Sequence, residues 1–413
     1  MKTLTFAEKL HLCLGVHIVL WLNAGNYSYV GPIIPSAVKF ALVGIWFALS
    51  LFGNKRFFAR YVVTAGPVAF FLFLTFLGKM LGNSSYFDQY GMNFVYALIL
   101  LGVFAYYFYS GSKQELRFLL VVFLLDVLIV ALVTYVNLLQ RPDLARILST
   151  SAANKQELLG YAIPRGLGGY GMCYTLLFLQ PIMAYWLNKK KASVLVKLML
   201  FGAVVLLLFR AQITLAFVLY PVLWILSHEL GKGNYVWTAS RLLLFAGVVV
   251  LVFALPSVLP RLIEAADYHL AERLQELLDM FQTQNISGAD TLSRVRLYQI
   301  SLDSFFANPL WGSFGAKTYG SHSTLLDCLG AFGVLGLVGV FGLFLPLRQV
   351  RTETKADRGL EKMRKITIGI VFFLSVINPV TGSEMLLTIT VIIPLFCKYF
   401  RMEFGENNES GSD

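Results

Sequence analysis

Residues 323–347, STLLDCLGAFGVLGLVGVFGLFLPL, decide the fold of this chain. Asp327 is the only charged residue in this run, which otherwise consists mainly of aliphatic, aromatic and glycine residues. A helix needs about 20 consecutive apolar residues to cross the hydrocarbon core of a bilayer. The run is long enough, so we predict that it forms a membrane-spanning helix.

Similar apolar runs recur from one end of the chain to the other. Of the 413 residues, 57% are hydrophobic and 14% are charged, and the mean hydropathy is +0.68. We therefore predict an all-α polytopic membrane protein with about twelve transmembrane helices. A continuous helix over residues 193–228 would overshoot the bilayer, so we expect a turn near Arg210. The expected spans are residues 11–25, 35–53, 61–82, 92–111, 117–139, 167–187, 193–209, 211–228, 241–260, 323–347, 366–380 and 382–400.

The Lys and Arg residues set the expected orientation. They give a net charge of +11, but they lie mostly in short connectors, which favours a topology signal over a nucleic-acid-binding surface. The positive-inside rule is satisfied when the N-terminus is cytoplasmic. The inner connectors then carry Lys55, Arg56 and Arg60, then Lys113 and Arg117, then Lys189, Lys190 and Lys191, and finally the run from Arg348 to Lys365.

Two outer segments, residues 140–166 and 261–322, are long, whereas the inner loops are short. We therefore expect function on the outer face. The chain divides into spans one to nine (1–260), a large outer loop (261–322), spans ten to twelve (323–400) and a cytoplasmic tail (401–413). Helical spacing of apolar residues from Leu262 to Phe281 predicts an amphipathic helix in the loop. A second helix of about four turns follows from SRVRLYQ, and Asn308-Pro309 should end it.

His322 is the best candidate for a general base on the outer face. Of the five histidines, only His269 and His322 lie outside under this topology. His322 stands at the N-terminus of a transmembrane helix, where backbone N–H groups disfavour the imidazolium and keep the ring neutral. A neutral imidazole at a lipid surface accepts a proton from an alcohol. The alternative is an interfacial histidine whose polar tip faces water.

Arginines at the outer boundary suggest an anionic ligand. Arg210 lies between two apolar runs, and Arg294 and Arg296 lie two residues apart at the start of the second loop helix. Arg210, Arg294 and His322 together suggest a base beside a bidentate cation clamp for a phosphate or pyrophosphate, and a lipid-linked diphosphate fits the membrane setting. The alternatives are snorkelling for Arg210 and a solvated or lipid-phosphate contact for Arg296. In PRGLGGYG, Arg165 begins the sixth span, and close helix packing is the alternative to a diphosphate contact.

Other polar residues carry less information. Asp126 and Asp327 lie inside spans and are functional candidates, with a satisfied hydrogen bond as the alternative. The four cysteines lie in or beside apolar runs without a CxxC motif, so no disulfide framework or zinc site is indicated. No outer DxD or paired carboxylates stand at ligand spacing, so we expect neither a metal nor a cofactor. The first apolar run lacks a signal-peptide pattern, and we expect it to be retained.

Residues 293–336 resemble the O-antigen ligase and polymerase superfamily, most closely the lipopolysaccharide O-antigen ligases. The motifs are SRVRLYQ, NPLWGSFG and HSTLLDCLGAFGVLG. In those ligases a His followed by Asn, Ser or Gln stands nine residues before GxxG. Here His322 and Ser323 are followed by the nine residues from Thr324 to Phe332 and then by GVLG, which starts at Gly333. These glycines should let another helix approach closely.

The resemblance implies a GT-C-like glycosyltransferase architecture in the bacterial inner membrane, with a periplasmic loop and active site. The implied reaction moves polysaccharide from undecaprenyl pyrophosphate to a sugar hydroxyl of the lipid A core, with inversion and without a metal. His322 would act on the acceptor hydroxyl, while Arg210 and Arg294 would stabilise the departing pyrophosphate. Arg296, Arg165 and Ser323 are the expected substrate-binding residues, and the remaining expected partners are membrane lipids.

Two further functions stay open. A polysaccharide polymerase of the same superfamily would use a similar His and Arg set, but polymerases usually show an Arg-x10-Gly pattern. Neither Arg165, Arg210, Arg294 nor Arg296 has Gly at that spacing. A non-catalytic flippase for lipid-linked glycans would predict charged residues in the middle of many spans and an internal repeat, and the sequence shows neither.

Overall fold

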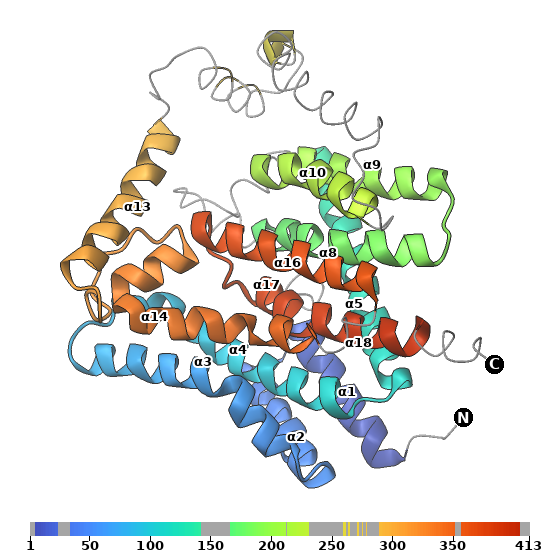
Figure 1. Cartoon of the computed structure of the whole chain (residues 1–413), viewed down its shortest axis with the longest axis horizontal. Coiled ribbons are helices and arrows are strands. Elements are labelled where there is room, and N and C mark those ends of the chain that lie inside the picture. The colour runs from blue at the N-terminus through green and yellow to red at the C-terminus, as the bar shows by residue number, and fades with distance from the viewer. Residues whose placement is uncertain are drawn as a thin grey trace.

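The computed structural model describes residues 5–23, 34–141, 166–211, 213–230, 259–261, 263–264, 271, 275, 278, 289–351 and 357–404. In this part of the chain every regular element is helical (Figure 1). The helices are α1 (Phe6–Leu22), α2 (Ser36–Gly53), α3 (Phe57–Met80), α4 (Ser85–Ser110), α5 (Lys113–Gln140), α8 (Tyr170–Lys189), α9 (Val194–Arg210), α10 (Thr214–Leu230), α13 (Ala289–Ala307), α14 (Thr324–Gln349), α16 (Arg358–Ile377), α17 (Ser383–Leu387), the π-helical η2 (Thr388–Ile392) and α18 (Ile393–Phe404).

The all-helical prediction is confirmed for the described residues, and the length and composition of several helices are compatible with a membrane protein. Six described helices are long and apolar enough to span a bilayer, namely α2, α3, α4, α5, α14 and the continuous stretch Ser383–Phe404. The other expected spans also coincide with helices, except residues 241–260, which lie almost entirely outside the described residues. The count of twelve spans and the GT-C-like arrangement stay predictions. The turn expected near Arg210 is present, because α9 ends there and α10 begins at Thr214.

Local sequence signals fix several helix starts. Ser112 and Glu115 form a capping box at the start of α5, in which each side chain binds the backbone N–H of the other residue. Asp357 caps α16 by accepting hydrogen bonds from the amides of Gly359 and Leu360. α16 therefore begins eight residues before the expected span, since its first turns are polar but still helical.

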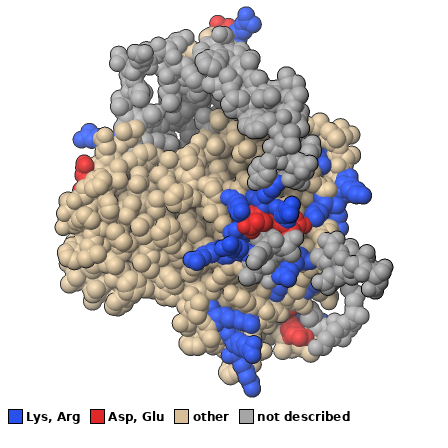
Figure 2. Space-filling view, in the orientation of Figure 1, with Lys and Arg blue, Asp and Glu red and all other residues tan. Residues whose placement is uncertain are grey.

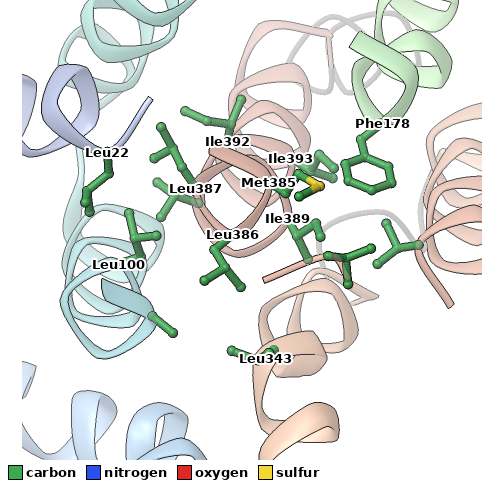
Figure 3. Packing of buried hydrophobic residues seen from close by; sticks show 14 of the residues in the cluster. Leu22, Leu100, Phe178, Leu343, Met385, Leu386, Leu387, Ile389, Ile392 and Ile393 are labelled. Atoms are coloured by element: carbon green, nitrogen blue, oxygen red, sulfur yellow. The ribbon is translucent and has the colours of Figure 1, made fainter. Parts of the chain in front are cut away.

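The centre of the bundle is the stretch from α17 through η2 to α18. In the most apolar 18-residue stretch of Ser383–Phe404, 83% of the residues are buried, a larger share than in any of the other five long apolar helices. Figure 3 shows that α1, α4, α8 and α14 surround it, and it labels one contact residue from each: Leu22, Leu100, Phe178 and Leu343. The side chains of Leu387, Ile389, Ile392 and Ile393 are fully buried there. This segment is the core on which the surrounding helices pack.

The two ends of the bundle differ in their charged side chains. The start of α1 and the end of α18 lie at the same end as the C-terminus of α8 and the start of α16 (Figure 1), and most of the Lys and Arg visible in Figure 2 gather towards that end. We call it the basic end, and we define it by Lys113, Lys189, Lys190, Asp357 and Glu403. Ion pairs link them: Lys113 Nζ lies 3.1 Å from Glu403 Oε2, and Lys189 Nζ lies 2.8 Å from Asp357 Oδ2. We call the opposite end, with residues 308–323 and 378–382, the loop end; the cytoplasmic assignment of the basic end stays a prediction.

Candidate functional site

The structure places the predicted site residues on several elements. His322 is exposed at the loop end, immediately before the Ser323 cap of α14. Arg210 is the last residue of α9, which packs on α5, α8 and α10. Arg296 is exposed on α13, the helix that packs on α14. Arg294 lies on α13 as well, but its side chain is outside the described part of the structure, as is all of Arg165.

The carboxylate of Asp327 holds the backbone on both sides of His322. Its Oδ1 accepts hydrogen bonds from the Ser321 amide at 3.1 Å and from Ser301 Oγ at 2.9 Å. Its Oδ2 accepts hydrogen bonds from the Ser323 amide at 3.0 Å and from the Tyr90 hydroxyl at 3.4 Å. Asp327 is 1% exposed, so the satisfied hydrogen bond weighed as its alternative role is present. The two amides fix the position of the His322 backbone.

Asp327 also changes the electrostatic setting of His322. The helix N-terminus alone disfavours the imidazolium, and this was the basis for expecting a neutral ring. The charge of Asp327 also interacts with His322. The imidazole therefore stands near a buried carboxylate as well as near a helix N-terminus, and the neutral ring expected from the helix N-terminus alone stays a prediction.

A polar turn anchored to α4 precedes His322. Gln89 Oε1 accepts hydrogen bonds from Lys317 Nζ at 3.3 Å, from the Tyr319 hydroxyl at 3.1 Å and from Ser321 Oγ at 3.2 Å. Burial, together with the charges of Asp327 and Asp88, raises the pKa of Tyr319 far above its usual value, so its hydroxyl remains a donor. Ser321 has φ = 64°, a left-handed conformation that few non-glycine residues adopt. Such strain concentrates at functional sites, and here it directly precedes His322.

Ser323, an expected substrate-binding residue, has a structural role here. It is fully buried, and its Oγ accepts a hydrogen bond from the Leu326 amide at 3.0 Å as the cap of α14. The same hydroxyl donates to the Ser375 carbonyl on α16 at 3.1 Å. These two bonds use the hydroxyl inside the protein, and its part in substrate binding stays a prediction.

The connection between α16 and α17 supports the start of α14. The Thr324 amide donates to the Asn378 carbonyl at 3.2 Å, and Thr324 Oγ1 accepts from the Val380 amide at 2.8 Å. On the other side, the Tyr298 hydroxyl of α13 donates to the Ile377 carbonyl at 2.7 Å. Tyr298 is the aromatic residue of the loop motif, and it fixes the arginine-bearing helix to the end of α16.

Gly333 interrupts α14. Its φ of 59° and ψ of −146° are not helical, and the chain from Pro309 to Gly315 packs into the break. The Ser313 amide donates to the Gly330 carbonyl at 3.0 Å, and the Val334 amide donates to the Pro309 carbonyl at 2.9 Å. A Cβ on Gly333 would overlap the carbonyl of Pro309.

The expectation that the GVLG glycines admit another helix is therefore wrong. Gly333 admits the loop, and a Cβ on Gly336 would overlap the backbone of Cys328 in the first half of α14 itself. The close helix contact occurs one to two turns later, where Gly339 packs against Phe71 and Gly342 packs against Val68, both on α3.

The glycine-rich start of α8 packs closely. A Cβ on Gly171 would overlap the side chain of Glu384, so the close-packing interpretation of PRGLGGYG holds at this residue. Beside it lies a cavity of about 30 Å³ lined by Asn23, Gly168, Thr175 and Glu384 among others. Glu384 is more than 200 residues from this motif in the sequence, and the fold brings the two together.

Arg210 has a polar atom that the described residues leave unpaired. Its Nε is buried and has no hydrogen-bond partner among them. Burying a guanidinium nitrogen is costly unless an anion compensates, so the geometry is compatible with an anionic ligand near the end of α9. Among the described residues, no group of three His, Cys, Asp or Glu side chains is placed to hold a metal ion.

A scan against protein-family models and a search of curated proteins each found no match to this chain. The resemblance to O-antigen ligases therefore rests on the sequence motifs around His322 alone.

Proposed function

We propose that the protein is a membrane glycosyltransferase of the O-antigen ligase type. It moves polysaccharide from undecaprenyl pyrophosphate to a sugar hydroxyl of the lipid A core, on the periplasmic side of the bacterial inner membrane. The observation that carries the proposal is the corner at His322: an exposed imidazole whose flanking amides are both held by one buried carboxylate. A base whose backbone is fixed on both sides, at the start of an apolar helix long enough to span a membrane, suits an acceptor hydroxyl.

The chemistry divides between the histidine and the arginines. His322 accepts the proton of the acceptor hydroxyl while that oxygen forms a bond to the anomeric carbon. The bond from this carbon to the pyrophosphate oxygen breaks, its electron pair leaves with the pyrophosphate, and the configuration inverts. Arg210 and Arg294 stabilise the charge that develops on the leaving group, because guanidinium groups match pyrophosphate oxygens in pairs. Arg296 takes the role of Arg294 if the register of the loop motif slips.

Product analysis tests the proposal. Purified His322→Ala in proteoliposomes should lose glycan transfer, whereas Gln299→Ala, an exposed change on α13, should retain it. Full transfer by His322→Ala would refute the assignment of His322 as the general base. The wild-type product then separates the candidates: a glycan on lipid A core means ligase, a longer undecaprenyl-linked glycan means polymerase, and translocated donor without a new bond means flippase.

A further inference from the structure

A cavity of about 250 Å³ opens at the basic end, between the C-terminal part of α8, the start of α16 and Ser227 of α10. The start of α16, which lines this cavity, lies at the opposite end of the bundle from the start of α14, which follows His322 (Figure 1). The polar wall of the cavity includes Asn188, Lys189, Asp357 and Lys362, and its apolar wall includes Pro181 and Ile366. The proposed glycan transfer uses none of these residues.

The acceptor atoms of the polar wall are already occupied. Asp357 Oδ2 accepts hydrogen bonds from Lys189 Nζ at 2.8 Å and from the Tyr185 hydroxyl at 2.7 Å, and Oδ1 accepts from two amides at the start of α16. Burial raises the pKa of this carboxyl, but the bonds from Lys189, Tyr185 and the Leu360 amide outweigh it and hold the pKa below its usual value. Asn188 Oδ1 accepts from Lys197 Nζ at 2.7 Å. The charge of Lys189 is balanced by Asp357, so the cavity wall offers mainly the N–H donors of Lys189, Lys362 and Asn188, which suit an anion.

The position of the cavity indicates a lipid. Lys189 and Lys362 line the cavity together with one aspartate, Asp357. On α8, Pro181 lies about two turns from Lys189, and on α16, Ile366 lies about one turn from Lys362. The apolar wall therefore continues from the lysines towards the middle of the bundle. Trp186 on α8 is partly exposed next to the cavity residues Tyr185 and Asn188, as tryptophans often are at the level of lipid headgroups. Basic pockets between transmembrane helices at the cytoplasmic side are sites where anionic headgroups bind. A free anion would leave the apolar wall unused.

We propose that this cavity binds one anionic phospholipid, whose phosphate meets Lys189, Lys362 and Asn188 and whose glycerol and first acyl carbons lie against Pro181 and Ile366. The lipid would tie α8, α10 and α16 together at the basic end. This site is independent of the glycan transfer at the loop end.

Native mass spectrometry of the purified protein tests the site. Phosphatidylglycerol should bind in preference to phosphatidylcholine, and Lys362→Gln should lower phosphatidylglycerol occupancy about fivefold at equal lipid concentration. Lys362→Arg should retain it. Lys365→Gln is the matched control, because Lys365 lies on the same helix, is 69% exposed and does not line the cavity. Melting temperatures without lipid show that each variant is folded.

Three outcomes would overturn the proposal. They are equal binding of phosphatidylcholine, equal losses in Lys362→Gln and Lys365→Gln, and a melting-temperature increase with inorganic phosphate that phosphatidylglycerol does not produce. The first would mean an unselective lipid contact, the second general surface charge, and the third a free-anion site. His322→Ala should keep full lipid occupancy, so a failure of the proposed enzyme leaves this result unaffected.

Discussion

The hydroxyl of Ser301 on α13 donates a 2.9 Å hydrogen bond to the carboxylate of Asp327 on α14, and the same oxygen accepts a 2.9 Å bond from the Gly320 amide. One buried hydroxyl thus joins the loop helix, the polar turn and the start of the transmembrane helix around His322. Both bonds are inaccessible to water, because Ser301 and Asp327 are each 1% exposed. A water molecule cannot simply replace either partner.

Ser301→Ala should lower the free energy of unfolding by about 1–3 kcal/mol, since it leaves the Gly320 amide without its acceptor. Thermal melting in detergent measures the loss. Ser313→Ala is the control, because the Ser313 hydroxyl donates a local bond to the Ala316 carbonyl, three residues along the chain. Equal melting temperatures for the two variants would show that the buried hydroxyl contributes no more than a local turn.

Asp327→Asn keeps the shape of the side chain but turns one acceptor oxygen into a donor that faces a backbone amide. We expect kcat of glycan transfer to fall at least tenfold with little change in KM, because the substitution moves His322 without removing a substrate contact. Steady-state kinetics on folded protein measure the two constants. A rise in KM alone would instead give Asp327 a role in binding.

Conservative arginine substitutions test the pyrophosphate clamp. Arg294→Lys should reduce transfer strongly, because an ammonium group cannot make the paired contacts of a guanidinium. Arg296→Lys should have a small effect, since Arg296 is exposed. If Arg296→Lys is the damaging change and Arg294→Lys is active, then the clamp belongs to Arg296. Arg210→Lys should resemble Arg294→Lys.

Gly333→Ala should destabilise the protein by more than about 1–3 kcal/mol, which is the usual cost of such backbone strain alone. The methyl group would in addition meet the carbonyl of Pro309. Gly369→Ala in α16 has open space around the new methyl and should be neutral or slightly stabilising, by about 0.5–1 kcal/mol. The melting temperature should therefore fall clearly for Gly333→Ala and stay unchanged or rise slightly for Gly369→Ala. A small shift for Gly333→Ala would mean that the break in α14 is not a feature of the folded protein.

Gly171→Ala should lower the melting temperature because its methyl group overlaps Glu384. Adding Glu384→Ala should restore much of that loss, since it removes the side chain that the methyl group meets. A double-mutant cycle measures this coupling. Additive effects of the two changes would show that the residues do not touch.

Hydropathy could predict where the helices lie but not how they pair. The run that contains α5 was predicted at residues 117–139 and observed at Lys113–Gln140, a difference explained by the capping box at Ser112. The start of α16 was missed because its charged residues resemble a loop. In the structure Arg364 and Glu361 neutralise one another through a 2.7 Å ion pair. Short-range signals of this kind are readable in the sequence once capping and i,i+3 pairs are considered.

The candidate site was predictable only in part. The motif identified His322, but its supporting partners come from far away in the chain: Ser301 from α13, Gln89 from α4 and Ser375 from α16. No local pattern encodes such contacts. The left-handed conformation of Gly333 was equally hidden, because a glycine at that spacing looks the same whether it admits a helix, a loop or a break.

The break at Gly333 divides α14 into two parts with different neighbours. The short first part, which begins beside His322, is bonded to the segment after α13, while the longer second part packs through Gly339 and Gly342 on α3. Thinning or thickening of the bilayer tilts a long span but acts only weakly on a short segment that is hydrogen-bonded to a loop. We therefore expect a change in bilayer thickness to shift the second part of α14 more than the short first part, which begins beside the imidazole.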